Sequence, residues 1–140
     1  MTGIIIVAHG ELAGELVNSV AMIMGRVPLL RAVGLGSDQS LDDLKREIEE
    51  AWQELERGGA RQILVLVDMF GGSCSNVAAR LVCDSEPGQI AVVTGVNLPM
   101  VLEASIDRDL YKLKDLVDKI VKAGRKSIVD VRAVLAEKLR

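Results

Sequence analysis

Two kinds of apolar pattern alternate along the first 107 residues of the chain. Short apolar runs without alternation, rich in β-branched residues, are typical of strands that are covered on both faces. Such runs predict strands at residues 3–8, 29–33, 62–67 and 89–94. Segments with apolar residues every three or four positions predict helices after Gly10, at 41–57, after Gly72 to about 83, and from Pro99 to about 107. Strands that alternate with helices in this way indicate an open, mostly parallel, doubly wound α/β sheet.

The last third of the chain has a less regular pattern. Apolar positions predict a helix over residues 112–123, ending before Gly124. Beyond Arg125 the pattern is ambiguous: Ser127–Val131 has the composition of a short strand, and Ala133–Leu139 fits one or two turns of a last helix. No linker or internal repeat divides the chain, so residues 1–140 are expected to form one domain.

Composition narrows the class of protein. With 49% apolar and 26% charged residues, the chain resembles an ordinary globular domain. A net charge of -3 and only three aromatic residues argue against nucleic-acid binding. No apolar run reaches the roughly 18 residues of a membrane span. Met1 leads directly into the first strand, without a basic leader-like segment, so we expect a cytoplasmic protein.

A glycine-rich turn follows the strand at residues 62–67. Asp68 stands at the carboxyl end of that strand, the edge at which open α/β sheets bind ligands. Gly71 and Gly72 allow backbone N–H groups to approach a ligand closely, and Ser73 is placed to cap the next helix or to bind an anion. The same pattern also fits a plain strand-to-helix turn with an Asp cap.

The single histidine of the chain, His9, ends the first strand and is followed by Gly10. In the flavodoxin-like strand order 2-1-3-4, the first and third strands are neighbours, so His9 and Asp68 are expected to meet. A carboxylate that accepts a hydrogen bond from one ring nitrogen leaves the other nitrogen with a lone pair. The helix N-termini after Gly10 and Gly72 are then placed to hold a phosphoryl group. These features favour a phosphohistidine, a chemistry that needs neither a metal nor a cofactor.

Two cysteines, Cys74 and Cys83, lie nine residues apart on one predicted helix. This spacing places them on roughly opposite sides of the helix, which argues against both a disulfide and a metal-binding pair.

The chain resembles the IIA component of the mannose family of the phosphoenolpyruvate-dependent sugar phosphotransferase system. The matching motifs occur in order along nearly the whole chain: residues 8–10 with Leu12 and Ala13, 67–68 with 71–73 and Asn76, 94–100 with Glu103, and 123–125. The resemblance implies that His9 accepts a phosphoryl group from the phosphocarrier protein HPr and passes it to a histidine of a IIB component. Asp68 would orient His9, and Gly10, Gly71, Gly72 and Ser73 would hold the phosphate.

The resemblance also implies a homodimer in which a short antiparallel strand near the C-terminus is exchanged between subunits, with Ser127–Val131 as the candidate strand. Contact with a membrane permease would occur only through IIB. In the family a proline and a bulky residue usually follow the Gly-Gly-Ser motif, whereas this chain has Cys74 and Ser75, which makes the rim of the site smaller and more polar. The choice of partner and of sugar, and a transport or a purely regulatory role, stay open.

Two other functions compete with this interpretation. Small tetrapyrrole metal chelatases also place a His-Gly pair after a first strand, but they are expected to use a further ligand, and this chain has no second histidine. A flavodoxin-like or receiver-like binding module without chemistry is the other alternative. Flavin stacking would require aromatic residues, of which only Phe70 lies near the site, and a receiver would require acidic residues where the chain has His9.

Overall fold

The computed structural model describes residues 1–139 of the chain as four strands and six helices. The strands are β1 (Thr2–His9), β2 (Leu30–Leu35), β3 (Gln62–Val67) and β4 (Ile90–Thr94). The helices are α1 (Leu12–Met24), α2 (Leu41–Arg57), α3 (Ser73–Cys83), α4 (Leu98–Asp107), α5 (Leu113–Lys126) and α6 (Val131–Lys138). The predicted elements of the first 107 residues are therefore confirmed, with bounds that differ by at most about two residues.

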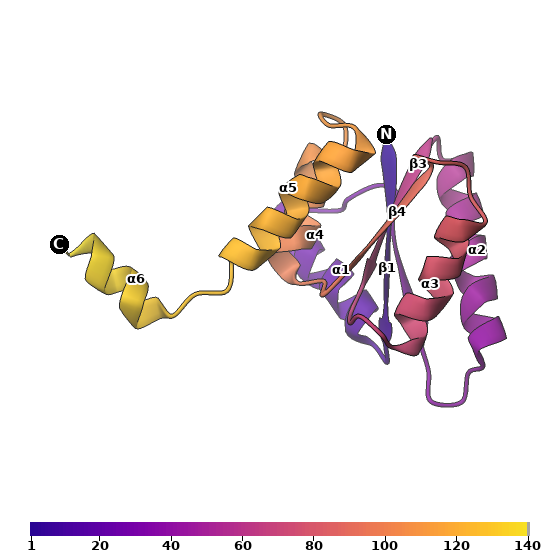
Figure 1. Cartoon of the computed structure of the whole chain (residues 1–140), viewed down its shortest axis with the longest axis horizontal. Helices are drawn as coiled ribbons and strands as arrows, with labels where there is room; N and C mark the ends of the chain where they lie inside the picture. The colour runs from indigo at the N-terminus through magenta and orange to yellow at the C-terminus, as the bar shows by residue number, and fades with distance from the viewer. Residues whose placement is uncertain (140) are drawn as a thin grey trace.

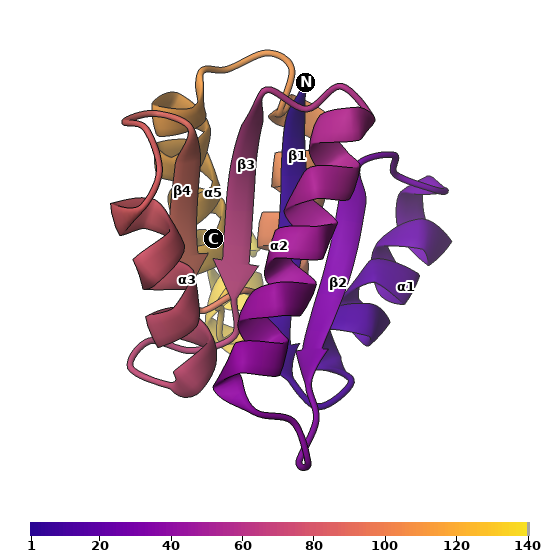
Figure 2. The ribbon, with the colours of Figure 1, turned by 90° about the vertical axis from the view of Figure 1, so that its right-hand side faces the viewer.

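All four strands are parallel, in the order β2-β1-β3-β4. Figures 1 and 2 show the sheet between two helical layers, with α2 and α3 on one face and α1, α4 and α5 on the other. Each layer closes its own apolar core over the sheet. The side chains of β1 and β3 are buried on both sides, which explains why these strands are apolar without alternation.

Side-chain caps hold the N-termini of two of the helices. The Ser40 hydroxyl accepts from the Asp43 N–H at 3.1 Å and the Asp43 carboxylate accepts from the Ser40 N–H at 3.1 Å, so α2 starts with a capping box. Asn97 caps α4 by accepting from the Met100 N–H, and a proline occupies the first turn.

The predicted end of the helix before Gly124 is wrong, because α5 continues to Lys126. Gly124 lies inside the helix, where it makes room for Met100 of α4: a Cβ at this position would come within 2.5 Å of Met100 Cγ. The glycine is thus required by close helix packing rather than by a chain turn.

The predicted strand at Ser127–Val131 is absent from the described chain, in which residues 128–130 have no regular structure and Val131 begins α6. A strand needs an edge to pair with, and this segment leads away from the sheet (Figure 1). The expected last helix is present as α6, which buries none of its residues. Ile128, Val131 and Leu135 are exposed on this arm.

Candidate functional site

The parallel register of β1 and β3 brings His9 and Asp68 together at the carboxyl edge of the sheet. Val7 pairs with Val67, and the Asp68 N–H continues the ladder by donating to the Val7 carbonyl at 3.1 Å. His9, two residues further along β1, therefore lies beside the carboxylate. The expected encounter of the two residues is confirmed.

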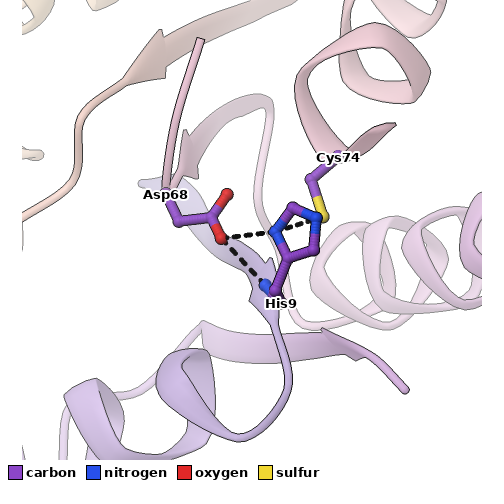
Figure 3. A group of neighbouring side chains, drawn as sticks. All are labelled: His9, Asp68 and Cys74. Carbon is purple, nitrogen blue, oxygen red and sulfur yellow. Dashed lines mark hydrogen bonds and ion pairs between the residues drawn. The ribbon is translucent and has the colours of Figure 1, made fainter. Parts of the chain in front are cut away.

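The Asp68 carboxylate is held by three hydrogen bonds, and Figure 3 shows the two that involve His9. Its Oδ2 lies 2.7 Å from His9 Nδ1 and accepts from the His9 backbone N–H at 2.9 Å. Its Oδ1 accepts from the Met69 N–H at 2.9 Å. Asp68 is largely buried, with 12% of its side chain exposed, whereas 47% of the His9 side chain is exposed. The carboxylate is thus fixed in the protein, and the imidazole faces solvent.

The ionisation of Asp68 decides which nitrogen of His9 carries a proton. Partial burial alone would raise the pKa of Asp68, but the hydrogen bonds from the His9 backbone and ring, the charge of His9 and the Met69 N–H together lower it. An ionised carboxylate can only accept, so Nδ1 must donate its proton to Oδ2. In the neutral ring, Nε2 then holds the lone pair.

The loop between β3 and α3 differs in detail from the prediction. Gly72, not Ser73, is the N-cap of α3, and no side chain caps the helix. The Ser75 hydroxyl accepts from the Gly71 N–H at 2.9 Å and donates to the Gly72 carbonyl at 3.0 Å, so Ser75 braces the turn from within. The Gly71 N–H is therefore already bonded. Gly71 has a φ of 84°, a conformation that favours glycine.

The start of α3 lies against the imidazole. A Cβ added at Gly72 would be 3.6 Å from His9 Cε1, the ring carbon bonded to both nitrogens. Because α3 lacks a side-chain cap, the N–H groups of its first turn have no side-chain acceptor. The helix dipole adds a partial positive charge at the same place.

Gly10 shapes the turn after His9, but its backbone N–H is not free to bind a ligand. It has a φ of 61°, and its N–H donates to the Leu35 carbonyl at 2.9 Å. A Cβ at Gly34 of β2 would lie 2.4 Å from the Gly10 carbonyl oxygen, so the two glycines permit the close turn after His9.

The sequence places Cys74 at the rim of the site, but the structure buries it beneath the rim, against the imidazole of His9. Its Sγ lies 3.8 Å from His9 Nδ1, and the residue is fully buried. Burial and the nearby charge of Asp68 raise the pKa of the Cys74 thiol to about 11, so it stays protonated at neutral pH. Cys83, at the other end of α3, is exposed, and both cysteines are free thiols.

His9, Asp68 and Cys74 each offer a donor atom within 4.8 Å of the other two. Figure 3 shows the imidazole between the carboxylate and the thiol, with Nδ1 directed at Asp68. One metal ion bound by all three would require the ring to turn and the thiol to lose its proton. The arrangement fits a hydrogen-bonded His–Asp pair packed on a thiol better than a metal centre.

Exposed apolar side chains lie beside the site. Phe70 is 85% exposed and Met69 is 53% exposed, both in the loop that follows Asp68. Large apolar side chains left in solvent at the mouth of a site indicate a surface that meets another molecule.

Residues 3–121 match the family described as "PTS system fructose IIA component". The fructose-specific EIIA component of Bacillus subtilis is 30% identical over 127 residues, covering 91% of this chain and 84% of that protein. The mannose-specific EIIAB component of Escherichia coli K12 is 29% identical over 136 residues, which cover 96% of this chain and 41% of that longer protein. A crystal structure of the component EIIA from Streptococcus agalactiae superposes with a TM-score of 0.87 at 30% identity, covering 95% of this chain and 99% of that one.

The strand order and the helical layers define a flavodoxin-like α/β domain, and the family match identifies the family to which it belongs. The chain belongs to the mannose-type IIA family of the sugar phosphotransferase system, and its function is phosphoryl transfer within such a system. Neither the chelatase nor the plain binding module is supported by these relatives. No helix among residues 1–139 is long and apolar enough to cross a membrane.

Proposed function

We propose that His9 carries the phosphoryl group, and that Nε2 is the atom that accepts it. The observation that supports this most directly is the 2.7 Å contact between Nδ1 and Asp68, which leaves the Nε2 lone pair on the exposed side chain. Nε2 forms a bond to phosphorus as the donor N–P bond breaks, and the electron pair of that bond returns to the donor nitrogen. Asp68 stabilises the positive charge that develops on the ring.

The phosphate would be held mainly at the N-terminus of α3. The first-turn N–H groups and the Ser73 hydroxyl are the donors best placed for it, since α3 has no side-chain cap. Gly72 keeps this side of the imidazole free of a side chain. The Gly71 and Gly10 N–H groups are bonded elsewhere, so these two residues would shape the pocket without donating to phosphate.

The donor would be phospho-HPr and the acceptor a histidine of a IIB component. Both partners would have to reach the same half-exposed imidazole, so they would use one surface in turn. Phe70 and Met69 are the apolar residues beside that imidazole, and we assign them to this shared docking surface. Contact with a membrane permease would then occur through IIB alone, in the cytoplasm. No cofactor takes part in this scheme.

A homodimer would cover the exposed C-terminal arm, residues 127–139. In the described chain β4 is an edge strand paired only with β3, and a groove lined by Gly95, Val121 and Ile128 lies along it. The apolar arm from Ile128 to Leu139 is exposed on a single chain. Pairing of residues 127–131 with the sheet of a second subunit would cover both surfaces. Light scattering after gel filtration tests this: full-length protein should be a dimer, and a chain ending at Lys126 should be a monomer.

Phosphorylation is tested by incubating wild type, His9→Gln and His9→Ala with phosphoenolpyruvate, the general phosphotransferase enzyme and HPr. Intact-mass spectrometry should show one acid-labile phosphoryl group on wild type and none on either variant. An acid-stable adduct, or an adduct that survives in folded His9→Gln, would place the phosphoryl group elsewhere.

A further inference from the structure

A cavity lies at the opposite end of the sheet from His9. It has a volume of about 540 Å³, within the range of small-molecule sites, and lies where β1 and β3 begin and α4 connects to α5. Figures 1 and 2 show this connection, in orange, beside the N-terminus and away from the carboxyl ends of the strands. The eight residues of β1 separate the two ends by roughly 23 Å at 3.3 Å per residue.

Arg108 is the unusual residue of this cavity. It follows α4 and is 4% exposed, a degree of burial that is rare for arginine without a carboxylate partner. No carboxylate within residues 1–139 lies close enough to form an ion pair with it. Its neighbour Asp107 instead contacts Lys119 Nζ at 2.6 Å. Burial lowers the pKa of Arg108, and Asp109 opposes this effect through its charge.

The guanidinium uses little of its hydrogen-bonding capacity inside the protein. Its only hydrogen bond among residues 1–139 runs from Nη1 to the Leu29 carbonyl at 3.4 Å, and that carbonyl already accepts from the Ile4 N–H at 2.9 Å. In this part of the chain no completely buried side-chain nitrogen lacks a partner. The unbonded nitrogens of Arg108 must therefore keep contact with solvent, and the cavity that Arg108 lines provides it.

The other charged residues of the cavity add to the positive potential. Arg61 and Lys112 line it with Arg108, against the single carboxylate of Asp109. The excess of positive charge matches the dianion of a phosphate monoester near neutral pH. A guanidinium binds a phosphate through two parallel hydrogen bonds, and its attraction is strongest where water is partly excluded.

We propose that this cavity binds a small phosphorylated molecule, such as a sugar phosphate, with Arg108 as the principal ligand of the phosphate group. Arg61 and Lys112 contribute from the rim, and the volume leaves room for an organic group about the size of a sugar. The site is separate from His9 and does not depend on the phosphohistidine.

The test is thermal unfolding of the full chain, at constant ionic strength, with glucose 6-phosphate, glucose or inorganic phosphate as probe. Glucose 6-phosphate should raise the midpoint temperature of unfolding saturably. For a domain of this size the rise should be about 5 °C when the ligand concentration is ten times the dissociation constant. Glucose should have no effect. Backbone amide NMR shifts should centre on residues 61–62 and 108–112.

Arg108→Met keeps the aliphatic stem of the side chain and should abolish the shift. Arg108→Lys keeps the charge but cannot form two parallel hydrogen bonds to a phosphate, and Arg61→Gln removes a charge at an exposed position. Each variant should raise the dissociation constant for glucose 6-phosphate by about tenfold or more. Arg80→Gln, the same loss of charge on α3, is the matched control and should bind like wild type. Saturable binding that survives in Arg108→Met, equal weakening by Arg80→Gln, or no saturable binding by wild type overturns the proposal. Equal stabilisation by inorganic phosphate refutes the sugar-sized ligand and shows an adventitious ion only.

Discussion

Replacing Asp68 by Asn tests the proposed role of the His–Asp pair most sharply, because it keeps the shape of the side chain and removes its charge. The wild-type carboxylate accepts from three N–H groups: the His9 ring and backbone at Oδ2, and the Met69 backbone at Oδ1. An amide has one acceptor oxygen and one NH₂ group. In either orientation, the NH₂ group of Asn must face a position now occupied by a donor.

Both orientations weaken phosphoryl transfer. With the amide oxygen toward His9, the NH₂ group opposes the Met69 N–H, and the ring loses a charge-assisted hydrogen bond worth about 1.5–3 kcal/mol. With the NH₂ group toward His9, Nδ1 becomes an acceptor and the proton moves to Nε2, which removes the nucleophilic lone pair. A loss of about 2.7 kcal/mol corresponds to a fall of roughly 100-fold in kcat/KM for phospho-HPr.

The assay has two readouts. Rapid-quench kinetics with phospho-HPr gives the rate, and ¹⁵N NMR of histidine-labelled protein gives the tautomer, which is unambiguous because His9 is the only histidine. Asp84→Asn, at the exposed C-terminal end of α3, is the matched control and should leave both readouts unchanged. If Asp68→Asn transfers phosphate at the wild-type rate, the proposed role of the carboxylate is wrong. If the rate falls, the tautomer separates the two causes: retained Nδ1 protonation indicates the lost charge of Asp68, and Nε2 protonation indicates the lost lone pair.

The same variant has a pH signature in stability. The pKa of Asp68 is lowered in the folded protein, so its ionisation stabilises the fold above the unfolded-state value of about 3.9, and this contribution is lost as the pH falls through the folded pKa. The unfolding midpoint of wild type should therefore exceed that of Asp68→Asn at pH 7. The gap should narrow below about pH 4. A gap that is constant from pH 7 to pH 3 would show that the charge of Asp68 does not stabilise the fold.

Three further predictions follow from packing and exposure. At pH 8 iodoacetamide should alkylate the exposed Cys83 and leave buried Cys74 unmodified, as read by peptide mass spectrometry; equal labelling would contradict the raised thiol pKa. Gly124→Ala should destabilise the protein by about 1–3 kcal/mol through its clash with Met100, and a second change, Met100→Ala, should recover part of the loss caused by the clash in a double-mutant cycle. Phe70→Ser should raise KM for phospho-HPr by about 5- to 30-fold with little change in kcat or unfolding midpoint; an unchanged KM would remove Phe70 from the docking surface.

The central elements could be predicted from the sequence because their signals are local. The buried runs of β1 and β3 have no alternation, and α2 combines regular apolar spacing with a capping box, so each element is specified by its own residues. Gly124 was misread because its cause is not local: the glycine accommodates a methionine from another helix. In the sequence, a glycine near the end of an apolar pattern looks the same whether it ends a helix or makes room for a side chain of another helix.

The arm after α5 shows a second limit of sequence reasoning. Residues 127–131 contain β-branched residues, but a strand forms only where an unpaired edge is within reach. In the described chain the segment leads away from the sheet, and the following residues close into α6 instead. A strand supplied to another subunit would be specified by two chains together.

At the site, strand ends were easier to predict than loop contacts. His9 and Asp68 follow from where the strands stop and from the strand order. The roles of Ser75 and Cys74 depend on the path of the turn between them, because Ser75 reaches back to Gly71 while Cys74 turns inward to the imidazole. The Gly-Gly sequence indicates a tight turn but does not specify which following hydroxyl will brace it.

The two ends of the sheet obtain positive electrostatic potential in different ways, and this difference supports a role for Arg108 in anion binding. In a parallel α/β fold the helices run opposite to the strands, so the N-termini of α1 and α3 gather near His9, where their dipoles supply partial positive charge. The C-terminal end of α4 lies at the other edge, where its dipole contributes negative charge, and any anion bound at that edge must be attracted by side chains. A cation that only balanced the α4 dipole would be equally well placed on the exposed surface, where its solvation costs nothing. Arg108 is buried beside a cavity, and most of its guanidinium donors have no partner among residues 1–139. This arrangement is expected when the counter-ion comes from outside the chain.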